Sequence, residues 1–291
     1  MFCGHKDLKE SFSVLSKKGN LSHGYIFFGE PQVGKFSFAL LLANFLETGE
    51  FSLSRRMLSE ALIIKESGID CVREIKNFLW QKPQNSSKRT VIIDNADSLT
   101  AEAQSAILKI TEEPPEHSLI ILIVSNLNNV LPPILSRLQK IYFSRIGKNE
   151  IRDFLIKSLG IKKDKAEELA VLAYGRPGRA IELINNKELS EIDKMAQNFL
   201  RSTGYNRSQI IKTLIEEQKF RSATRSVGTE DSRLHGESGE KSEILDQFFE
   251  SLIVILRKDP VKNHQMIKSV LNRLFLIKSY NVNKRLQLEA I

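Results

Sequence analysis

One segment of the sequence has the residue types and spacing of a phosphate-binding loop. It reads Gly29-Glu30-Pro31-Gln32-Val33-Gly34-Lys35-Phe36, which completes the G-x-x-x-x-G-K pattern. Glycines let backbone N–H groups close on phosphate oxygens, and the lysine reaches the outer phosphates of a nucleotide. The candidate nucleotide-binding residues of this segment are therefore Gly29, Gly34 and Lys35, and ATP or ADP is the expected ligand.

The residue after the lysine is unsuited to metal binding. Position 36 normally carries a Ser or Thr hydroxyl that ligates Mg²⁺, whereas this chain has the phenyl ring of Phe36. Ser37 follows, but one further residue along a helix turns the side chain by about 100°. The loop is therefore expected to hydrolyse a nucleotide poorly, and the sequence leaves open whether it holds ATP, ADP or no nucleotide.

A second candidate site lies at the end of a predicted strand. The run Thr90 to Ile93 is followed by Asp94, as in a Walker B strand, whose aspartate faces the metal beside the phosphate loop. Asn95 stands where ATPases of this type place the Glu that polarises the attacking water. An amide has no basicity with which to accept a proton. A metal ligand and a general base are therefore missing from one site, although each substitution could also be neutral.

The first half of the chain alternates apolar strands with amphipathic helices, which predicts a mostly parallel α/β sheet covered on both faces. Strands are expected at 24–28, 90–93, 119–124 and 140–143, and helices at 36–46 and 100–111. Several strands end in polar residues, and ligands bind at the carboxyl edge of such sheets. Asn126 is the candidate polar residue after the third strand, although Ser125-Asn126 is also ordinary turn chemistry.

After about Phe143 the predicted strands stop and the chain becomes helical. Helices are expected at 149–159, 163–173, from 179 onward, 193–200, 208–219, 241–258, 261–280 and 284–290. Residues 222–239 are rich in Ser, Gly and charge without periodicity, which predicts a flexible loop. The predicted domains are 1–145 (α/β), 146–192 (small helical) and 193–291 (helical).

Composition indicates a globular protein with a basic surface. The 291 residues carry a formal net charge of +8, which favours a polyanionic neighbour such as nucleic acid or a merely solvated basic surface. No apolar run is long enough to span a bilayer and no signal peptide is visible, so a cytoplasmic location without membrane contact is expected. Cys3 and Cys71 lack metal-ligand spacing, so no zinc site is predicted.

Several motifs in series resemble the AAA+ modules of bacterial clamp loaders. They are Asp94 to Asp97, Gln104 to Lys109, Glu112 to Pro115, Ser125-Asn126, Leu131 to Gln139 and Asn281 to Ala290. Within that family the chain is most similar to the delta-prime type of DNA polymerase III subunit. The resemblance implies a RecA-like P-loop domain, a small helical lid, and an all-α collar domain that joins a ring of five subunits.

The resemblance also implies a role for one arginine. The Ser-Arg-Cys motif of the family carries an arginine finger that reaches the ATP of a neighbouring subunit, and here the motif reads Ser136-Arg137-Leu138. Without the family context, Arg137 would be an ordinary surface arginine before a strand. The sensor-2 arginine of active family members would fall at Gly178, with Arg179 displaced by one position. The implied partners are gamma/tau- and delta-type subunits, the sliding clamp and, through the complex, primer-template DNA.

The sequence leaves three functions to compare. The favoured one is a delta-prime-type clamp-loader subunit that is a poor ATPase by itself and donates Arg137 to a neighbour's ATP. The alternative is an active DNA-dependent AAA+ ATPase of the gamma/tau or helicase-loader type, with Mg²⁺ held by Asp94 and waters. Phe36 and Asn95 argue against that alternative. A free-standing nucleotide-binding signalling module would not account for Ser136-Arg137 or for the collar-like C-terminus.

Overall fold

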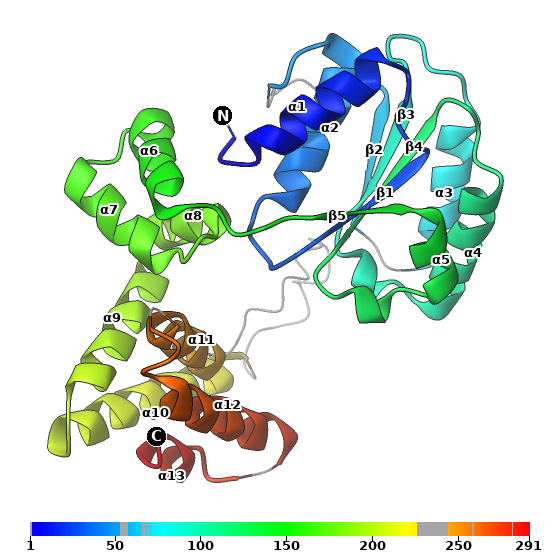
Figure 1. Cartoon of the computed structure of the whole chain (residues 1–291). Helices are drawn as coiled ribbons and strands as arrows, with labels where there is room; N and C mark the ends of the chain where they lie inside the picture. The colour runs from blue at the N-terminus through cyan, green and yellow to red at the C-terminus, as the bar shows by residue number, and fades with distance from the viewer. Residues whose placement is uncertain are drawn as a thin grey trace. The chain divides into compact units, whose positions relative to one another are not determined.

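The computed structural model describes residues 2–52, 58–65, 68, 70–225, 244–257, 259–280 and 282–291. The chain divides into two compact units, Met1–Ala180 and Ile181–Ile291, shown in Figure 1. The first unit contains the sheet. The further boundary expected at residues 145/146, between the α/β domain and a helical lid, stays a prediction.

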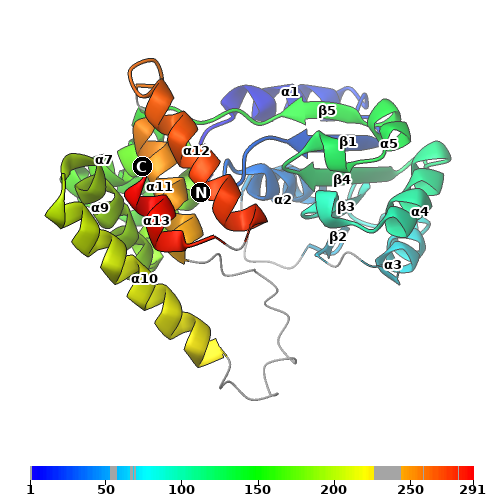
Figure 2. The ribbon, with the colours of Figure 1, turned by 90° about the horizontal axis from the view of Figure 1, so that it is seen from below.

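Among the described residues, five parallel strands form the sheet. They are β1 (Gly24–Phe28), β2 (Ala61–Ile64), β3 (Arg89–Ile93), β4 (Ser118–Val124) and β5 (Gln139–Tyr142). Their order is β2-β3-β4-β1-β5, which can be followed in Figure 2. The four strands expected from the sequence are confirmed to within one residue at each end, and the edge strand β2 is an addition.

Helices cover both faces of this sheet, which confirms the predicted α/β class (Figure 1). One face packs against α1 (Lys6–Lys17) and α2 (Lys35–Thr48), and the other against α3 (Asp70–Leu79), α4 (Ala101–Glu112) and α5 (Pro132–Arg137). The helix α4 begins where the Thr100 hydroxyl accepts a hydrogen bond from the backbone N–H of Ala103. Helices α1 and α3 were not expected from the sequence.

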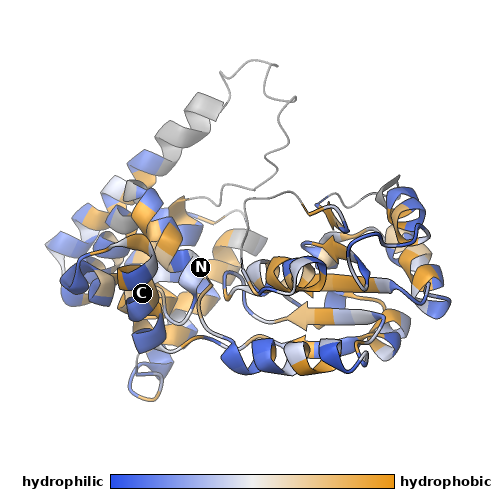
Figure 3. Ribbon diagram, turned by 90° about the horizontal axis from the view of Figure 1, so that it is seen from above, coloured by the Kyte–Doolittle hydropathy of each residue, from blue (hydrophilic) through white to orange (hydrophobic). Residues whose placement is uncertain are grey.

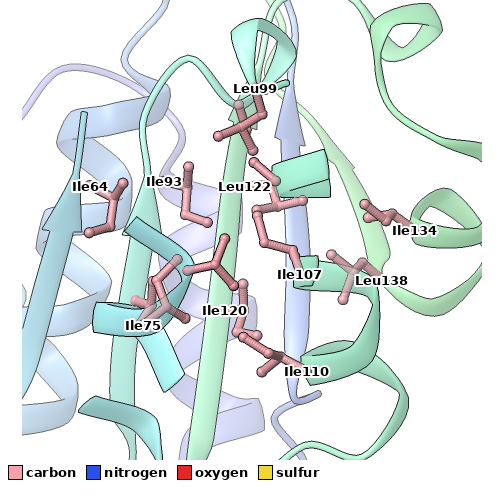
Figure 4. Close-up of a cluster of buried hydrophobic side chains, with 14 of the residues drawn as sticks. Ile64, Ile75, Ile93, Leu99, Ile107, Ile110, Ile120, Leu122, Ile134 and Leu138 are labelled. Carbon is pink, nitrogen blue, oxygen red and sulfur yellow. The ribbon is translucent and has the colours of Figure 1, made fainter. Parts of the chain in front are cut away.

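The two faces of the sheet carry different side chains, because successive residues of a strand point to opposite faces. The face under α3, α4 and α5 is aliphatic, with Ile93, Ile107, Ile120 and Ile134 in one cluster (Figure 4). Figure 3 shows the apolar residues concentrated along the strands and the polar ones on the outer sides of the flanking helices. The sheet is therefore buried on both sides, as a parallel sheet requires.

The face under α1 and α2 is an aromatic cluster. It consists of Phe12, Tyr25, Phe27, Phe38 and Phe143, whose ring centroids lie 5.0–6.3 Å apart in the contacting pairs. Most of these pairs are tilted or edge-on, the arrangement that aromatic quadrupoles favour. Because β1 and α2 both contribute to the cluster, it fixes the two elements that flank the phosphate loop.

After β5 the first unit continues with α6 (Lys148–Leu159), α7 (Lys163–Leu172) and the start of α8 (Pro177–Asn185). Helix α8 begins two residues before the predicted start at Arg179. Proline is well suited to a first helical position, because its fixed φ matches the helix and its missing N–H would be unpaired there anyway. Gly178 therefore lies inside the first turn of α8 rather than in a loop.

In the second unit the described residues form helices without strands, as the sequence predicted. They are the end of α8, α9 (Lys187–Arg201), α10 (Tyr205–Arg225), α11 (Ile244–Leu256), α12 (His264–Ser279) and α13 (Lys284–Glu289). Phe199, Phe248 and Leu252 belong to their common core. Of the described helices, none combines the length and apolar character needed to cross a membrane.

The predicted start of the flexible loop at residue 222 is wrong. Helix α10 continues through Arg225, because no Gly or Pro interrupts the chain before Gly228. The rest of that predicted loop, from residue 226 to residue 239, lies outside the described residues.

Candidate functional site

The phosphate loop joins β1 to α2 at the carboxyl edge of the sheet. Gly29 has a φ of 143°, and a Cβ added there would lie 2.5 Å from the backbone oxygen of Phe143. Gly34 has a φ of 106° and directly precedes the first residue of α2. Both values lie where side-chain-bearing residues are strained, so the backbone itself requires the glycines that the sequence motif predicted.

Lys35 is buried, and its ammonium group contacts the loop itself. The Nζ atom donates to the backbone oxygens of Gly29 at 2.6 Å and Glu30 at 2.8 Å. Burial lowers the pKa of this ammonium group, and the nearby carboxylates of Asp97, Asp94 and Glu30 oppose that shift. The two hydrogen bonds to Gly29 and Glu30 use two of the three N–H donors of the ammonium group, so one donor remains for a nucleotide phosphate.

Phe36 belongs to the core rather than to a metal site. Its side chain is half-buried and packs against the buried hydrophobic cluster that includes the aromatic residues under α1 and α2. A hard cation such as Mg²⁺ needs oxygen ligands, and the ring offers none. The loop thus keeps the glycines and the lysine of a phosphate site but lacks, at position 36, an oxygen ligand for the metal that accompanies ATP.

Asp94 follows β3 at the same edge of the sheet. Burial raises the pKa of the Asp94 carboxyl group, while the backbone N–H of Asn95 at 3.0 Å and the charges of Lys65 and Lys35 oppose that shift. The side chain of Asn95 is exposed, and its backbone is left-handed with a φ of 53°. Lys35 and Asp94 thus lie close enough for their charges to interact, as the two motifs predicted.

Asp97 connects the ends of two neighbouring strands. Its Oδ2 atom accepts the backbone N–H groups of Ser125 at 3.0 Å and Asn126 at 3.2 Å. Those residues follow β4, whereas Asp97 follows β3 within a short 3₁₀ turn, η1 (Ala96–Ser98). The side-chain oxygen of Asn126 accepts the N–H of Asn128 at 3.0 Å, so this residue caps the next turn. A contact of Asn126 with a nucleotide stays a prediction.

Arg145 and Gly178, which follow β5 in the chain, contact the phosphate loop. The guanidinium of Arg145 donates two hydrogen bonds from one edge to the Glu30 carboxylate, Nε to Oε2 at 2.9 Å and Nη2 to Oε1 at 2.5 Å. The Cζ atom of Arg145 also lies 4.1 Å from the ring centroid of Tyr174. The Gly178 N–H donates to the Gln32 oxygen at 3.0 Å. Two of these contacts, Arg145 with Glu30 and Gly178 with Gln32, therefore tie the loop to the chain that follows β5.

Gly178 occupies the position predicted for the sensor-2 arginine of active family members. A Cβ added to Gly178 would lie 2.9 Å from the Cβ of Gln32 and 3.1 Å from its backbone oxygen. These neighbours include backbone, which moves less readily than the end of a side chain. A side chain as large as arginine therefore has no room at this position. Arg179 follows it and is buried.

Residues near the start of the chain also contact the phosphate loop. The Nε2 atom of His5 is 3.0 Å from the backbone oxygen of Val33, and the Phe2 ring comes within 3.3 Å of a Cβ built at Gly34. The thiol of Cys3 lies 3.8 Å from the backbone oxygen of Glu150, and burial raises the pKa of this thiol to about 12. This N-terminal segment therefore adds contacts to Val33 and Gly34 of the loop.

His5 should make stability depend on pH. Burial lowers the pKa of its imidazole below the ordinary value of about 6.5. The unfolded chain then binds more protons than the folded chain between the two pKa values, so stability rises with pH across this window and is lost as the pH falls through it. We expect a thermal unfolding midpoint that drops on acidification below about pH 6.5, and a shallower drop in His5→Gln. The exposed His264 supplies the control His264→Gln, and equal slopes in all three proteins would contradict this prediction.

Arg137 makes its hydrogen bonds to residues outside the phosphate loop. It ends α5, and its Nη2 atom donates to Oε1 of Glu112 at 2.9 Å while Nη1 donates to the backbone oxygen of Pro133 at 3.0 Å. Its side chain is 37% exposed. The structure thus brings Arg137 to the end of α4 and not to Lys35 or Asp94 of its own chain.

Comparisons with known proteins identify the family. A sequence profile described as "DNA polymerase III, delta subunit" matches residues 4–147. A replication factor C small subunit from Methanosarcina barkeri is 30% identical over 259 residues, which cover 86% of this chain and 76% of that protein. The chain belongs to the clamp-loader family.

The share of each relative that the chain covers varies. Replication factor C small subunit 1 from Pyrobaculum islandicum is 30% identical over 186 residues, and the chain spans only 55% of that relative. A solved DNA polymerase III gamma subunit-related protein from Thermotoga maritima covers 96% of both chains with a TM-score of 0.52 and 22% identity. This likeness concerns the fold, and it agrees with the RecA-like AAA+ fold expected for a clamp-loader subunit.

Several residues of this clamp-loader site were not assigned a role from the sequence. Glu30 and Arg145 are separated by 115 positions, so no local sequence pattern predicts that they pair. Asp97 had a usable signal, because a carboxylate three positions after Asp94 falls beside the end of the next strand. For His5 the sequence offers no signal, since its contact with the loop depends on the packing of α1.

Proposed function

We propose that this chain is a clamp-loader subunit of the delta-prime type, which supplies Arg137 as an arginine finger to the ATP of a neighbouring subunit. It would thereby help to load a sliding clamp onto primed DNA during replication. One contrast supports this proposal most strongly. The chain's own loop lacks a metal ligand and is held by Arg145 and Gly178, whereas Arg137 is exposed and makes no contact with that loop within the described residues.

The arginine would act on charge. Phosphoryl transfer spreads negative charge over the γ-phosphate oxygens, and a guanidinium aimed at them stabilises that charge in the transition state. Arg137 is suited to this role because a guanidinium keeps its charge at neutral pH and offers several donors in a fixed plane. Ser136 and Arg137 lie at the end of a short helix anchored by the buried Ile134.

The chain's own nucleotide site would be a poor one. ATP or ADP at Lys35 would share the ammonium group with the backbone oxygens of Gly29 and Glu30, and its Mg²⁺ would find no oxygen ligand at Phe36. We therefore propose weak nucleotide binding or none at this loop, with Gly29, Gly34, Lys35 and Asp94 as the residues that any bound nucleotide would use.

The proposed partners follow from the family and from the second unit. They are gamma/tau- and delta-type subunits in a ring of five, the sliding clamp, and primer-template DNA through the complex. Several large apolar side chains of α12, α13 and the segment between them are exposed in the isolated chain, namely Leu271, Phe275, Tyr280 and Leu286. Such a surface suits assembly with other subunits, since apolar area is usually covered in a complex.

The purified chain alone should hydrolyse ATP at no more than a background rate. The reason is that Phe36 and Asn95 supply neither the metal ligand nor the general base of an ATPase. Release of phosphate by the isolated full-length chain measures this directly. An ordinary turnover, on the order of 1 s⁻¹ or faster, would contradict the proposal. If Phe36→Thr with Asn95→Glu left that turnover unchanged, the alternative of an active gamma/tau- or helicase-loader-type ATPase would be supported.

A further inference from the structure

The pair formed by Glu112 and Arg137 is carried by two well-anchored backbone segments. Glu112 is the last residue of α4 and follows Ile110 and Thr111, both of which are buried. Arg137 is the last residue of α5 and precedes the buried Leu138. Figure 4 shows Ile110 and Leu138 in the same aliphatic cluster. The two backbones are therefore fixed relative to each other, even though the paired side chains are 44% and 37% exposed.

The guanidinium is held from two directions. Its Nη2 atom donates to Oε1 of Glu112 on α4 at 2.9 Å, and its Nη1 atom donates to the backbone oxygen of Pro133 on α5 at 3.0 Å. Because these acceptors belong to different helices, together they restrict both the position and the plane of the group. A guanidinium has five N–H donors, so donors remain for a phosphate.

The location of Glu112 favours such a pair. The carboxylate stands at the C-terminal end of α4, where the unpaired backbone carbonyls carry partial negative charge. A carboxylate is unfavourable at this end of a helix unless a cation lies beside it. Arg137 supplies that cation, so the charge of Glu112 is best stabilised while the guanidinium stays beside it.

We propose that Glu112 is a positioning residue, which holds the guanidinium of Arg137 in the orientation that it uses on the neighbouring subunit's ATP. This inference rests on the proposed function of Arg137 as an arginine finger. Glu112 acts through Arg137 alone. Without it, the long arginine side chain would sample several rotamers, and only a fraction of them would present the group correctly.

The strength of the Glu112–Arg137 ion pair indicates whether Glu112 orients the guanidinium or instead keeps it away from a neighbouring ATP site. An exposed ion pair shifts the population of an orientation by at most about fivefold. An arginine finger contributes roughly 10³- to 10⁵-fold to the rate where it has been measured in other systems. Glu112 is therefore strong enough to select one orientation of Arg137 but too weak to keep it from an ATP site.

The kinetic test uses the reconstituted complex. Glu112→Ala should lower kcat at the neighbouring site by about two- to fivefold and leave the KM for ATP unchanged, and Glu112→Gln should fall in between because it keeps an oxygen acceptor. Glu113→Ala is the matched control, since no bond joins the exposed Glu113 to Arg137 within the described part of the chain. In an Arg137→Ala background, Glu112→Ala should have no additional effect.

A second readout does not depend on activity. In the isolated full-length chain, side-chain NMR of Arg137 should show slow rotation about the Nε–Cζ bond in the native protein and in Glu113→Ala, and faster rotation in Glu112→Ala. A native or raised kcat in Glu112→Ala, while Arg137→Ala is inactive, would overturn the positioning role alone, as would unchanged rotation in Glu112→Ala. Full activity of Arg137→Ala would instead overturn the arginine-finger proposal and the positioning role with it.

Discussion

Arg137→Ala should lower ATP hydrolysis at the neighbouring subunit's site by a factor of about 10³ to 10⁵, equivalent to roughly 4 to 7 kcal/mol of activation free energy. The effect should be this large because the lost group acts on charge that develops at the transition state. Assembly should be retained, since Arg137 bonds only to Glu112 and Pro133 among the described residues of its own chain. Hydrolysis should therefore fail in a ring that still forms.

The measurement must isolate one site, because hydrolysis elsewhere in a ring would hide the loss. A single-turnover assay on complexes in which the remaining ATP sites have been inactivated meets this need, with a pull-down to confirm assembly. Arg152→Ala is a suitable control, because Arg152 is another partly exposed arginine of the first unit, paired with Asp153 at 2.8 Å. Equal rates for the native and Arg137→Ala complexes would refute the proposed finger.

Phe27→Ala should lower the free energy of unfolding of the first unit by about 3 to 5 kcal/mol. The Phe27 ring is fully buried, and its centroid lies 5.0 Å from that of Phe143 and 5.8 Å from that of Phe38. Removing it leaves a cavity among rigid rings that cannot collapse easily. Since Phe27 lies on β1 directly before the phosphate loop, the loop should lose its order together with the core.

Urea unfolding followed by tryptophan fluorescence measures this change. The chain has one tryptophan, Trp80, which lies just after α3 in the first unit and so reports on that unit. Phe275→Ala is the control, because Phe275 is 61% exposed and belongs to the second unit. We expect the control to stay within about 0.5 kcal/mol of the native protein. A comparable loss in both variants would show that burial in the aromatic cluster is not the cause.

The sequence predicted those parts of the fold that rest on local patterns. Strands β1, β3 and β4 are buried apolar runs that stop at glycine or polar residues, so their type and their ends were both readable. The edge strand β2 has only four residues and is incompletely buried, which leaves too short a pattern to recognise. In α1 only Phe12 is fully buried within twelve residues, so its apolar stripe is faint.

The candidate site likewise contains residues that local patterns predict and contacts that they do not. The glycine frame, Lys35 and Asp94 were predicted because each is fixed by its spacing along one strand, loop or helix. The contacts of Glu30 with Arg145 and of Arg137 with Glu112 span 115 and 25 positions. They depend on how separate elements pack, and no period or motif in a single sequence encodes them. The pairing that most affects the proposed mechanism was therefore visible only in three dimensions.

The contacts around the phosphate loop bear on whether the first unit changes its structure with the ATP concentration. A loop of this kind usually exchanges partners when a nucleotide arrives and so reports the energy supply. Here Arg145, Gly178 and His5 already contact Glu30, Gln32 and Val33 of the loop without any nucleotide. We expect the first unit to keep the same internal geometry whether ATP is scarce or abundant. If the chain acts as proposed, its first unit should respond to neighbouring subunits rather than to the ATP concentration.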